Sequence, residues 1–316
     1  MSLILLIAFP MIMAVPIYFL RYYRTVAVLV SLVTILLLVG ICSQVTLYEP
    51  AYILGRELML DDFNRFLLMF LLGLISLLFV YAWQISQGWE FFPSLLLILG
   101  LLTGAMMIRN FLIAVLLLEM AGLIFVFMIH GERSVPVGTA VGYLVPLVIA
   151  IPCLLPVSWL IDNYALQPDS PLLIRFTVIA LSLGFGILLA AAPFHSWLPG
   201  VVQQAPSAAG ASLLCIFNLV SLSLLLGLLN SNLWLTADSN ALSVISVGGL
   251  LTALVGGALA FAQREPGRLL AYAAIGDMGL ILIGLGTGSL TGVTGALAHA
   301  INRSLSVLLV AMSVGT

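Results

Sequence analysis

A histidine flanked by two prolines interrupts an apolar part of the chain, in the segment Pro193-Phe194-His195-Ser196-Trp197-Leu198-Pro199; Pro206 follows shortly after. In a bilayer such a break is tolerated only inside protein or beside water, because free main-chain groups need partners. Ionisable residues at broken helices are typical of ion and substrate pathways. We therefore expect a broken helix, with His195 beside a hydrated pathway. A proline-kinked helix with a hydrogen-bonded histidine and an interfacial tryptophan would explain the same residues.

Four more ionisable residues stand inside apolar runs: Glu119, Asp277, His299 and Arg303. A charge at the bilayer centre costs at least about 2.5–3.5 kcal/mol, so these groups need interior partners or water. His299 and Arg303 share one helical face. A salt bridge from Arg303 to Asp277 would serve packing alone. Glu119 has no basic residue in its own run, and we expect it to exchange protons.

Every basic residue is an arginine; the chain has no lysine. Arginine does not deprotonate in proteins. Any proton relay is therefore confined to carboxylates, water and the three histidines, His130, His195 and His299.

Composition excludes a soluble protein: of 316 residues, 63% are hydrophobic and only 7% charged, with a mean hydropathy of +1.27. The net charge of −2 argues against a nucleic-acid partner. Cys42, Cys153 and Cys215 are isolated, which predicts neither a metal site nor a disulfide. We expect no cofactor, because no cysteine cluster, glycine-rich nucleotide loop or haem ligand pair is present.

Runs of about 20 apolar residues predict about eleven membrane spans in an all-α, multi-pass protein. They cover 2–20, 25–48, 63–83, 91–108, 111–129, 139–161, 171–192, 207–230, 240–262, 268–287 and 291–314, and 194–205 is a half-helix that completes the broken seventh span. The first run lacks a basic flank and is predicted to be a retained span. A modest arginine excess predicts an outside N-terminus.

Three ordered motifs carry a resemblance to a known family. The PFHSWLP segment with Ala205-Pro206-Ser207, the run RLLAYAAIGDMG from Arg268 to Gly279, and His299-Ala300-Ile301-Asn302-Arg303-Ser304-Leu305 agree with it in order and spacing, as does Glu119 in Leu-Glu-Met-Ala-Gly. They resemble the antiporter-like membrane subunits of respiratory complex I, membrane-bound hydrogenases and Mrp-type cation/proton antiporters. The resemblance covers roughly residues 55–314.

The resemblance implies two inverted five-helix repeats, here about 91–230 and an incomplete 240–316, in one membrane domain 1–316. We expect a proton path through Glu119, His195, Asp277, His299 and Arg303, for which the resemblance implies Glu119, His299 and Arg303. The chain departs from the family where Leu188, and Asn218 or Leu219, stand at lysine positions, and where Arg303 replaces a lysine. We also expect the last helices of the family fold to be lacking.

The function that this predicts is a membrane subunit of a proton-translocating oxidoreductase complex, conducting or scaffolding proton transfer. Its partners would be other membrane subunits, with quinone or redox modules only on partner chains, in a bacterial or archaeal inner membrane. A cation/proton antiporter or inorganic-carbon uptake component is an alternative. A structural spacer with a decayed channel is another.

Overall fold

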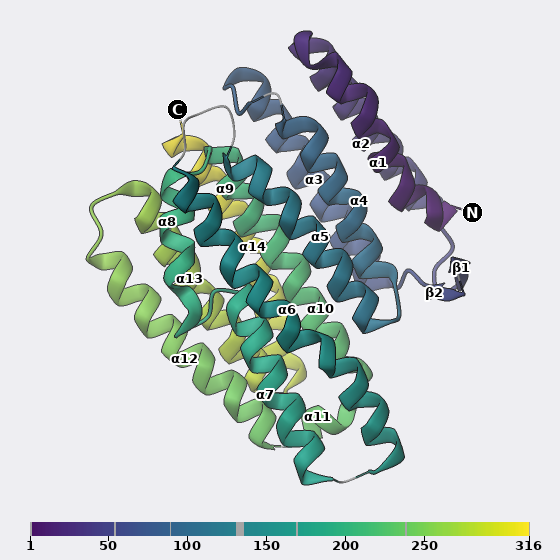
Figure 1. Ribbon diagram of the computed structural model, residues 1–316, viewed down its shortest axis with the longest axis vertical. Coiled ribbons are helices and arrows are strands. Elements are labelled where there is room, and N and C mark those ends of the chain that lie inside the picture. The colour runs from purple at the N-terminus through teal and green to yellow at the C-terminus, as the bar shows by residue number, and fades with distance from the viewer. Residues whose placement is uncertain are drawn as a thin grey trace.

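The protein is an all-α bundle of long, mostly antiparallel helices (Figure 1). The computed structural model describes residues 2–53, 55–88, 90–130, 136–168, 170–237 and 239–315. The first half comprises α1 (Ser2–Phe19), α2 (Arg24–Gln44), α3 (Asp62–Gln84), α4 (Phe91–Met107), α5 (Phe111–His130), α6 (Val137–Leu166) and α7 (Pro171–Leu188). The second half comprises α8 (Trp197–Gln204), α9 (Ser207–Ser212), α10 (Asn218–Ser231), α11 (Leu233–Ala237), α12 (Ser239–Phe261), α13 (Pro266–Gly286) and α14 (Leu290–Val314).

Short elements connect these helices. The 3₁₀ turn η1 (Leu20–Tyr22) joins α1 to α2, η2 (Phe194–Ser196) is also a 3₁₀ turn, and η3 (Leu213–Phe217) is π-helical. Strands β1 (Ala51–Ile53) and β2 (Arg56–Leu58) form an antiparallel hairpin between α2 and α3.

Ten helices within the described ranges are long and apolar enough to cross a membrane, and α4 is a shorter apolar helix. Together they correspond to the eleven predicted spans, with α9, η3 and α10 forming one of them. Helix α6 extends to Leu166 where the predicted span ended at 161. Helix α7 ends at Leu188 and not near residue 192. The prediction of a broken seventh span is therefore confirmed, with an earlier start to the break.

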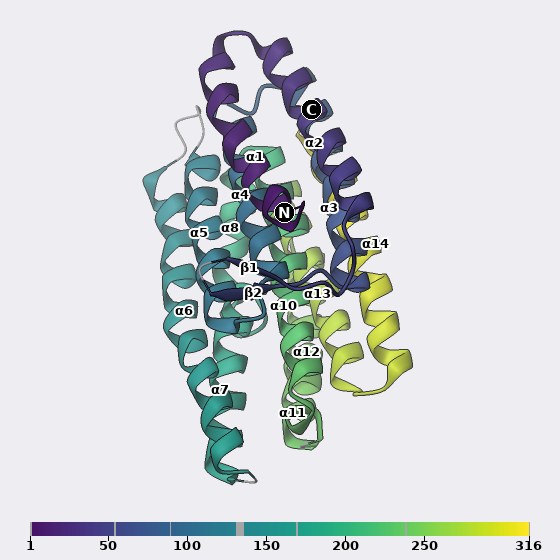
Figure 2. The ribbon, with the colours of Figure 1, turned by 90° about the vertical axis from the view of Figure 1, so that its right-hand side faces the viewer.

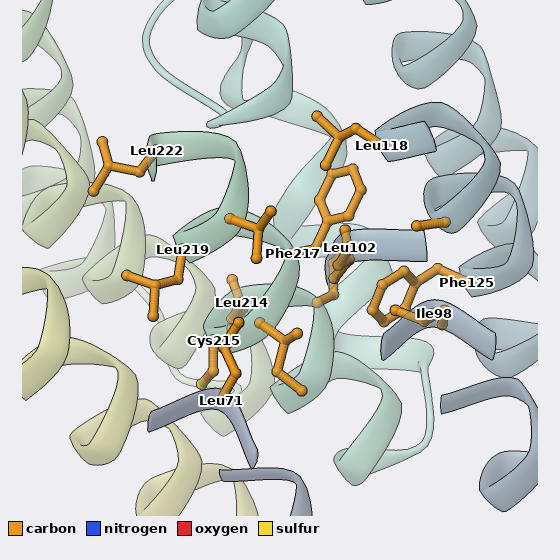
Figure 3. Close-up of a cluster of buried hydrophobic side chains, with 14 of the residues drawn as sticks. Leu71, Ile98, Leu102, Leu118, Phe125, Leu214, Cys215, Phe217, Leu219 and Leu222 are labelled. Carbon is orange, nitrogen blue, oxygen red and sulfur yellow. The ribbon is translucent and has the colours of Figure 1, made fainter. Parts of the chain in front are cut away.

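The span formed by α9, η3 and α10 is the centre of the bundle, with 83% of its most apolar window buried. Side chains from Leu214 to Leu222 pack there against Leu71 of α3, Ile98 and Leu102 of α4, and Leu118 and Phe125 of α5 (Figure 3). A helix that is apolar on all sides is stable only when other helices surround it. Helix α12 is the opposite case, with 17% of its window buried.

Small residues allow α12 and α13 to pack at backbone contact. A Cβ atom added to Gly256 would lie 2.7 Å from Gly276 Cα, and one added to Gly249 would lie 2.7 Å from Ile283 N. Small residues at helix crossings are the usual means of close packing in membranes. This crossing fixes α12 against the helix that carries Asp277.

Candidate functional site

The broken span begins where α7 ends in a left-handed turn. Ala190 has a φ of +51°, and the Ala190 and Ala191 amides donate to the oxygens of Ile187 and Gly186 at 3.1 and 2.8 Å. This is a Schellman-type helix end, a position at which glycine is usual. An alanine with positive φ carries strain, which persists only where the surroundings enforce it.

Two side chains make hydrogen bonds with main-chain groups at the break. The hydroxyl of Thr252, on α12, accepts a hydrogen bond from the Ala192 amide at 2.9 Å. The Trp197 indole donates to the Ile187 oxygen at 3.2 Å. Main-chain groups at membrane depth need such partners. Trp197 therefore closes the end of α7.

The prolines and Phe194 delimit the half-helix. Pro193 precedes η2, Pro199 lies within the first turn of α8, and Pro206 follows the end of α8. The Phe194 ring packs against Gly186, where an added Cβ would lie 3.3 Å from Cδ2. A residue before proline disfavours the α conformation, so α8 ends before Pro206.

Neighbouring helices hold α8 at its far end. Arg268 Nε donates to Gln203 Oε1 at 2.6 Å, and Thr139 of α6 donates to Gln204. The broken segment is therefore held by hydrogen bonds to α12 near Ala192, and to α6 and α13 at the end of α8.

His195 lies on η2 and faces α13. Its ring centroid is 6.3 Å from that of Tyr272. The ring is half-buried, and its Nδ1 atom is buried with no hydrogen-bond partner in the part of the chain that the structure describes. Buried polar atoms are almost always hydrogen-bonded, to protein or to water, so this nitrogen calls for a bound water.

Asp277 and His299 meet across α13 and α14. His299 Nε2 lies 3.5 Å from Asp277 Oδ1, which is ion-pair distance but too long for a good hydrogen bond. The two side chains are 37% and 34% exposed. An approach of about 0.3 Å would bring the carboxylate and the imidazole within the range for direct proton transfer.

Arg303 does not pair with Asp277, contrary to the salt bridge considered from the sequence. Its Nε donates to the Ala274 oxygen at 3.2 Å and its Nη1 to the Leu214 oxygen at 3.1 Å. The antiparallel register explains the difference: Asp277 stands opposite His299, which places Ala274 opposite Arg303, one turn further along.

The π-helical segment η3 supplies one of the oxygens that Arg303 binds. Cys215, in the same segment, donates to the Ser304 oxygen at 3.1 Å. The wider π turn disturbs the regular ladder of main-chain hydrogen bonds and is often found at functional sites. Through these contacts the central span and α14 are joined by polar interactions in an otherwise apolar core.

Glu119 stands apart from the other acidic and basic site residues. It is half-buried in the middle of α5 and makes no hydrogen bond or ion pair with another residue that the structure describes. One turn further, a Cβ on Gly122 would lie 3.3 Å from the Tyr143 hydroxyl. Tyr143 thus faces α5 at Gly122, about one turn along the helix from Glu119, and its ring lies 5.7 Å from Trp197 at the break.

Two buried polar side chains complete the site. Tyr143 Oη and both amide atoms of Asn218 are buried, without a partner among the described residues. Asn218 directly follows η3 and is 1% exposed. These groups mark positions where water molecules can bind inside the bundle.

A family model described as NADH:quinone oxidoreductase/Mrp antiporter, TM, matches residues 115–316. The chain belongs to this family. Its fold resembles the Mrp complex of Dietzia sp., with a TM-score of 0.85 and 20% identity over 98% of this chain and 37% of that one.

Two curated relatives are similar in sequence. NADH-quinone oxidoreductase subunit N 2 of Acidobacterium capsulatum is 34% identical over 46% of this chain and 30% of its own length. Formate hydrogenlyase subunit 3 of Escherichia coli is 31% identical over 64% of this chain and 35% of its own length. The match thus spans about a third of the length of either relative.

The structure distributes the predicted residues over three places: the break, the seam of α13 with α14, and the middle of α5. Sequence reasoning missed Thr252, Tyr143 and Tyr272, which contact residues of the break. A tyrosine in the middle of an apolar run was a signal that could have identified Tyr143. Leu188, at a family lysine position, is the last residue of α7 and is buried.

Proposed function

We propose that this chain is a membrane subunit of a proton-translocating oxidoreductase complex of the complex I or membrane-bound hydrogenase type. Family membership and the two relatives support the class of complex. The observation that carries the proposal is the broken seventh span, where His195 presents a buried, unpartnered nitrogen. A broken helix with an ionisable residue at membrane depth is typical of ion and substrate pathways, whereas helix packing alone does not require one.

The proposed proton route begins at Glu119 and passes the Tyr143 hydroxyl to reach His195 at the break. From there it follows α13, past Tyr272, to the Asp277–His299 pair. Contacts on this route support its order: Tyr143 faces α5 near Gly122, and its ring lies 5.7 Å from Trp197. His195 and Tyr272 are neighbours at 6.3 Å between ring centroids. Bound water would bridge the remaining gaps.

Arg303 has an electrostatic role in this proposal and carries no proton. Its guanidinium stays charged, and two main-chain oxygens hold it next to the seam. Arg303 thus places a fixed positive charge near the Asp277–His299 pair. A neutral imidazole can accept a proton on one nitrogen and release one from the other, which a permanently charged ring cannot do.

The orientation is part of the proposal. Arg24, Arg264 and Arg268 lie at helix ends that share one end of the bundle, while Arg133, which supports the same orientation, lies outside the described residues. The positive-inside rule places this end in the cytoplasm. The start of α1 then lies on the outer side of an inner membrane.

Proton flux through the purified complex tests the proposal. In proteoliposomes, a potassium diffusion potential drives proton entry, which an internal pH dye reports. Because the membrane potential and not electron transfer drives proton entry, the assay does not require the electron donor of the complex to be known. Glu119→Gln should lower the flux about 100-fold, within the range that a positioned proton carrier contributes.

Glu57→Gln is the matched control, because Glu57 lies on β2 beside Arg109 and outside the spans. Its flux should equal that of the parent chain. Unchanged flux in Glu119→Gln, with the complex intact, would exclude the route.

Co-purification with an iron–sulfur or hydrogenase module separates this function from that of a cation/proton antiporter component, which would lack such a partner.

A further inference from the structure

The amide side chain of Asn218 lies in the core of the bundle, where the described residues use none of its hydrogen-bonding groups. It is 1% exposed, and neither Oδ1 nor Nδ2 has a partner in that part of the chain. On α14, His299 Nε2 is also buried and unpartnered, because Asp277 Oδ1 is 3.5 Å away. Buried polar atoms are almost always paired with protein or with ordered water. Both side chains therefore require a bound water.

The antiparallel packing of the central span against α14 brings these two side chains to the same level. Figure 2 shows α14, in yellow, running along the bundle beside α13, and α14 also contacts α9 and η3. Arg303 Nη1 donates to the Leu214 oxygen at 3.1 Å. Residue numbers rise along one helix as they fall along the other. The position four residues after Leu214 therefore stands opposite the position four residues before Arg303, and these two positions are Asn218 and His299.

Two further contacts support this register. Cys215 donates to the Ser304 oxygen at 3.1 Å. Leu219 of α10 and Leu297 of α14 line the same small hollow between the helices. The two contacts lie on either side of the level of the unpartnered amide and imidazole, on both helices. The register is therefore fixed above and below them.

The π turn η3 orients Asn218 relative to the first part of its span. The main-chain N–H of Asn218 donates to the Leu213 oxygen, five residues back, and not to the Leu214 oxygen as in an α-helix. The Leu214 oxygen accepts from Arg303 instead. One additional residue in a helix rotates the side chains that follow by about 100° around the axis. Arg303 thus stabilises the turn that sets the direction of the Asn218 side chain.

We infer that Asn218 is a positioning residue of the proton route, and that its amide holds a water molecule against His299 Nε2. Because Asp277 Oδ1 lies beside the same nitrogen, this water has the roughly two to four polar partners that a buried water requires. An asparagine side chain carries no proton for transfer, so its contribution is to place the water through which His299 exchanges one. The effect on proton transfer rests on the proposed function, whereas the water site does not.

A high-resolution density map of the purified complex tests the water site directly. In the parent, a water peak should lie within hydrogen-bond distance of both the Asn218 amide and His299 Nε2. Asn218→Leu keeps a side chain of similar size without a polar atom, and the peak should vanish. A parent map without the peak, or a peak that persists in Asn218→Leu, would overturn the inference whether or not the complex conducts protons.

Proton flux in proteoliposomes measures what this water contributes to transfer. Asn218→Leu should lower the flux about tenfold, because transfer is sensitive to the placement of each participating group. Its unfolding midpoint should stay level or rise, since no described partner of the amide is lost. Asn218→Ser keeps a hydroxyl and leaves space for water, so it should recover most of the flux.

Asn232→Leu is the matched control, because Asn232 follows the end of the same span and its amide donates to the Leu228 oxygen. Its flux should equal that of the parent. Parental flux in Asn218→Leu, or an equal loss in Asn218→Leu and Asn218→Ser, would overturn the positioning role. Glu119→Gln, assayed in parallel, separates these outcomes from a failure of the proposed function, because its loss of flux shows that the route itself stands.

Discussion

Arg303 Nη1 lies 3.1 Å from the Leu214 oxygen, so a side chain of α14 binds the π-helical part of the central span. The same guanidinium reaches Ala274 of α13. One buried cation thus joins three spans of the bundle through two main-chain oxygens. Arginine suits this role because its rigid fork presents several donors, whereas lysine presents a point charge.

Replacement of Arg303 tests this bridge. Arg303→Ala removes two hydrogen bonds from a charged donor, to the Leu214 and Ala274 oxygens, at about 1.5–3 kcal/mol each. Arg303→Lys should recover part of this loss, because the charge is kept while the fork is not. The thermal unfolding midpoint of the purified complex measures both. Arg175→Ala, at an exposed position on α7, should leave the midpoint unchanged; equal midpoints for Arg303→Ala and the parent would refute the bridge.

Thr252 is predicted to hold the broken span in shape. Thr252→Val removes the acceptor for the Ala192 amide at constant volume, at about 1–3 kcal/mol. Hydrogen exchange at residues 189–192 should accelerate, because the break loses its contact with α12. Thr252→Ser keeps the hydroxyl and should exchange like the parent. If Thr252→Val also exchanges at the parental rate, the hydroxyl has no positioning role.

Adjacent glycines of α12 provide a matched test of the close crossing with α13. Gly256→Ala forces a methyl group toward the Gly276 backbone, while a Cβ on Gly257 meets nothing within 4 Å. Overpacking of this kind costs about 1–3 kcal/mol. Gly256→Ala should lower the unfolding midpoint, and Gly257→Ala should not. Equal midpoints in the two variants would show that the helices separate without cost.

The broken span could be predicted from the sequence because its signals are local. Pro193, Pro199 and His195 are residue types that an uninterrupted lipid-facing helix does not tolerate together. Hydropathy likewise predicted the spans, since each must be about 20 apolar residues long. Both inferences need only the residues of one segment.

The interhelical contacts could not be predicted in the same way. The sequence shows that His299 and Arg303 share a helical face, but it does not show the register of α13 against α14. That register places Ala274, and not Asp277, opposite Arg303. Thr252 was missed for the same reason, because its partner amide is on a different helix. The π turn at 213–217 contains no glycine or proline to indicate it.

Tyr143 gives the sharpest separation of function from stability on the proposed route. Its hydroxyl is buried without a partner among the described residues, so Tyr143→Phe removes a polar group that contributes little to folding. The unfolding midpoint should stay within error or rise. Proton flux in proteoliposomes should fall about tenfold or more, because the step between Glu119 and His195 loses its hydroxyl.

Tyr164→Phe is the control for the loss of a tyrosine hydroxyl. Tyr164 lies at the opposite end of the same helix, stacked on Trp234, and this variant should keep full flux. Parental flux in Tyr143→Phe, with Glu119→Gln inactive, would mean that protons leave Glu119 by a path that does not pass α6.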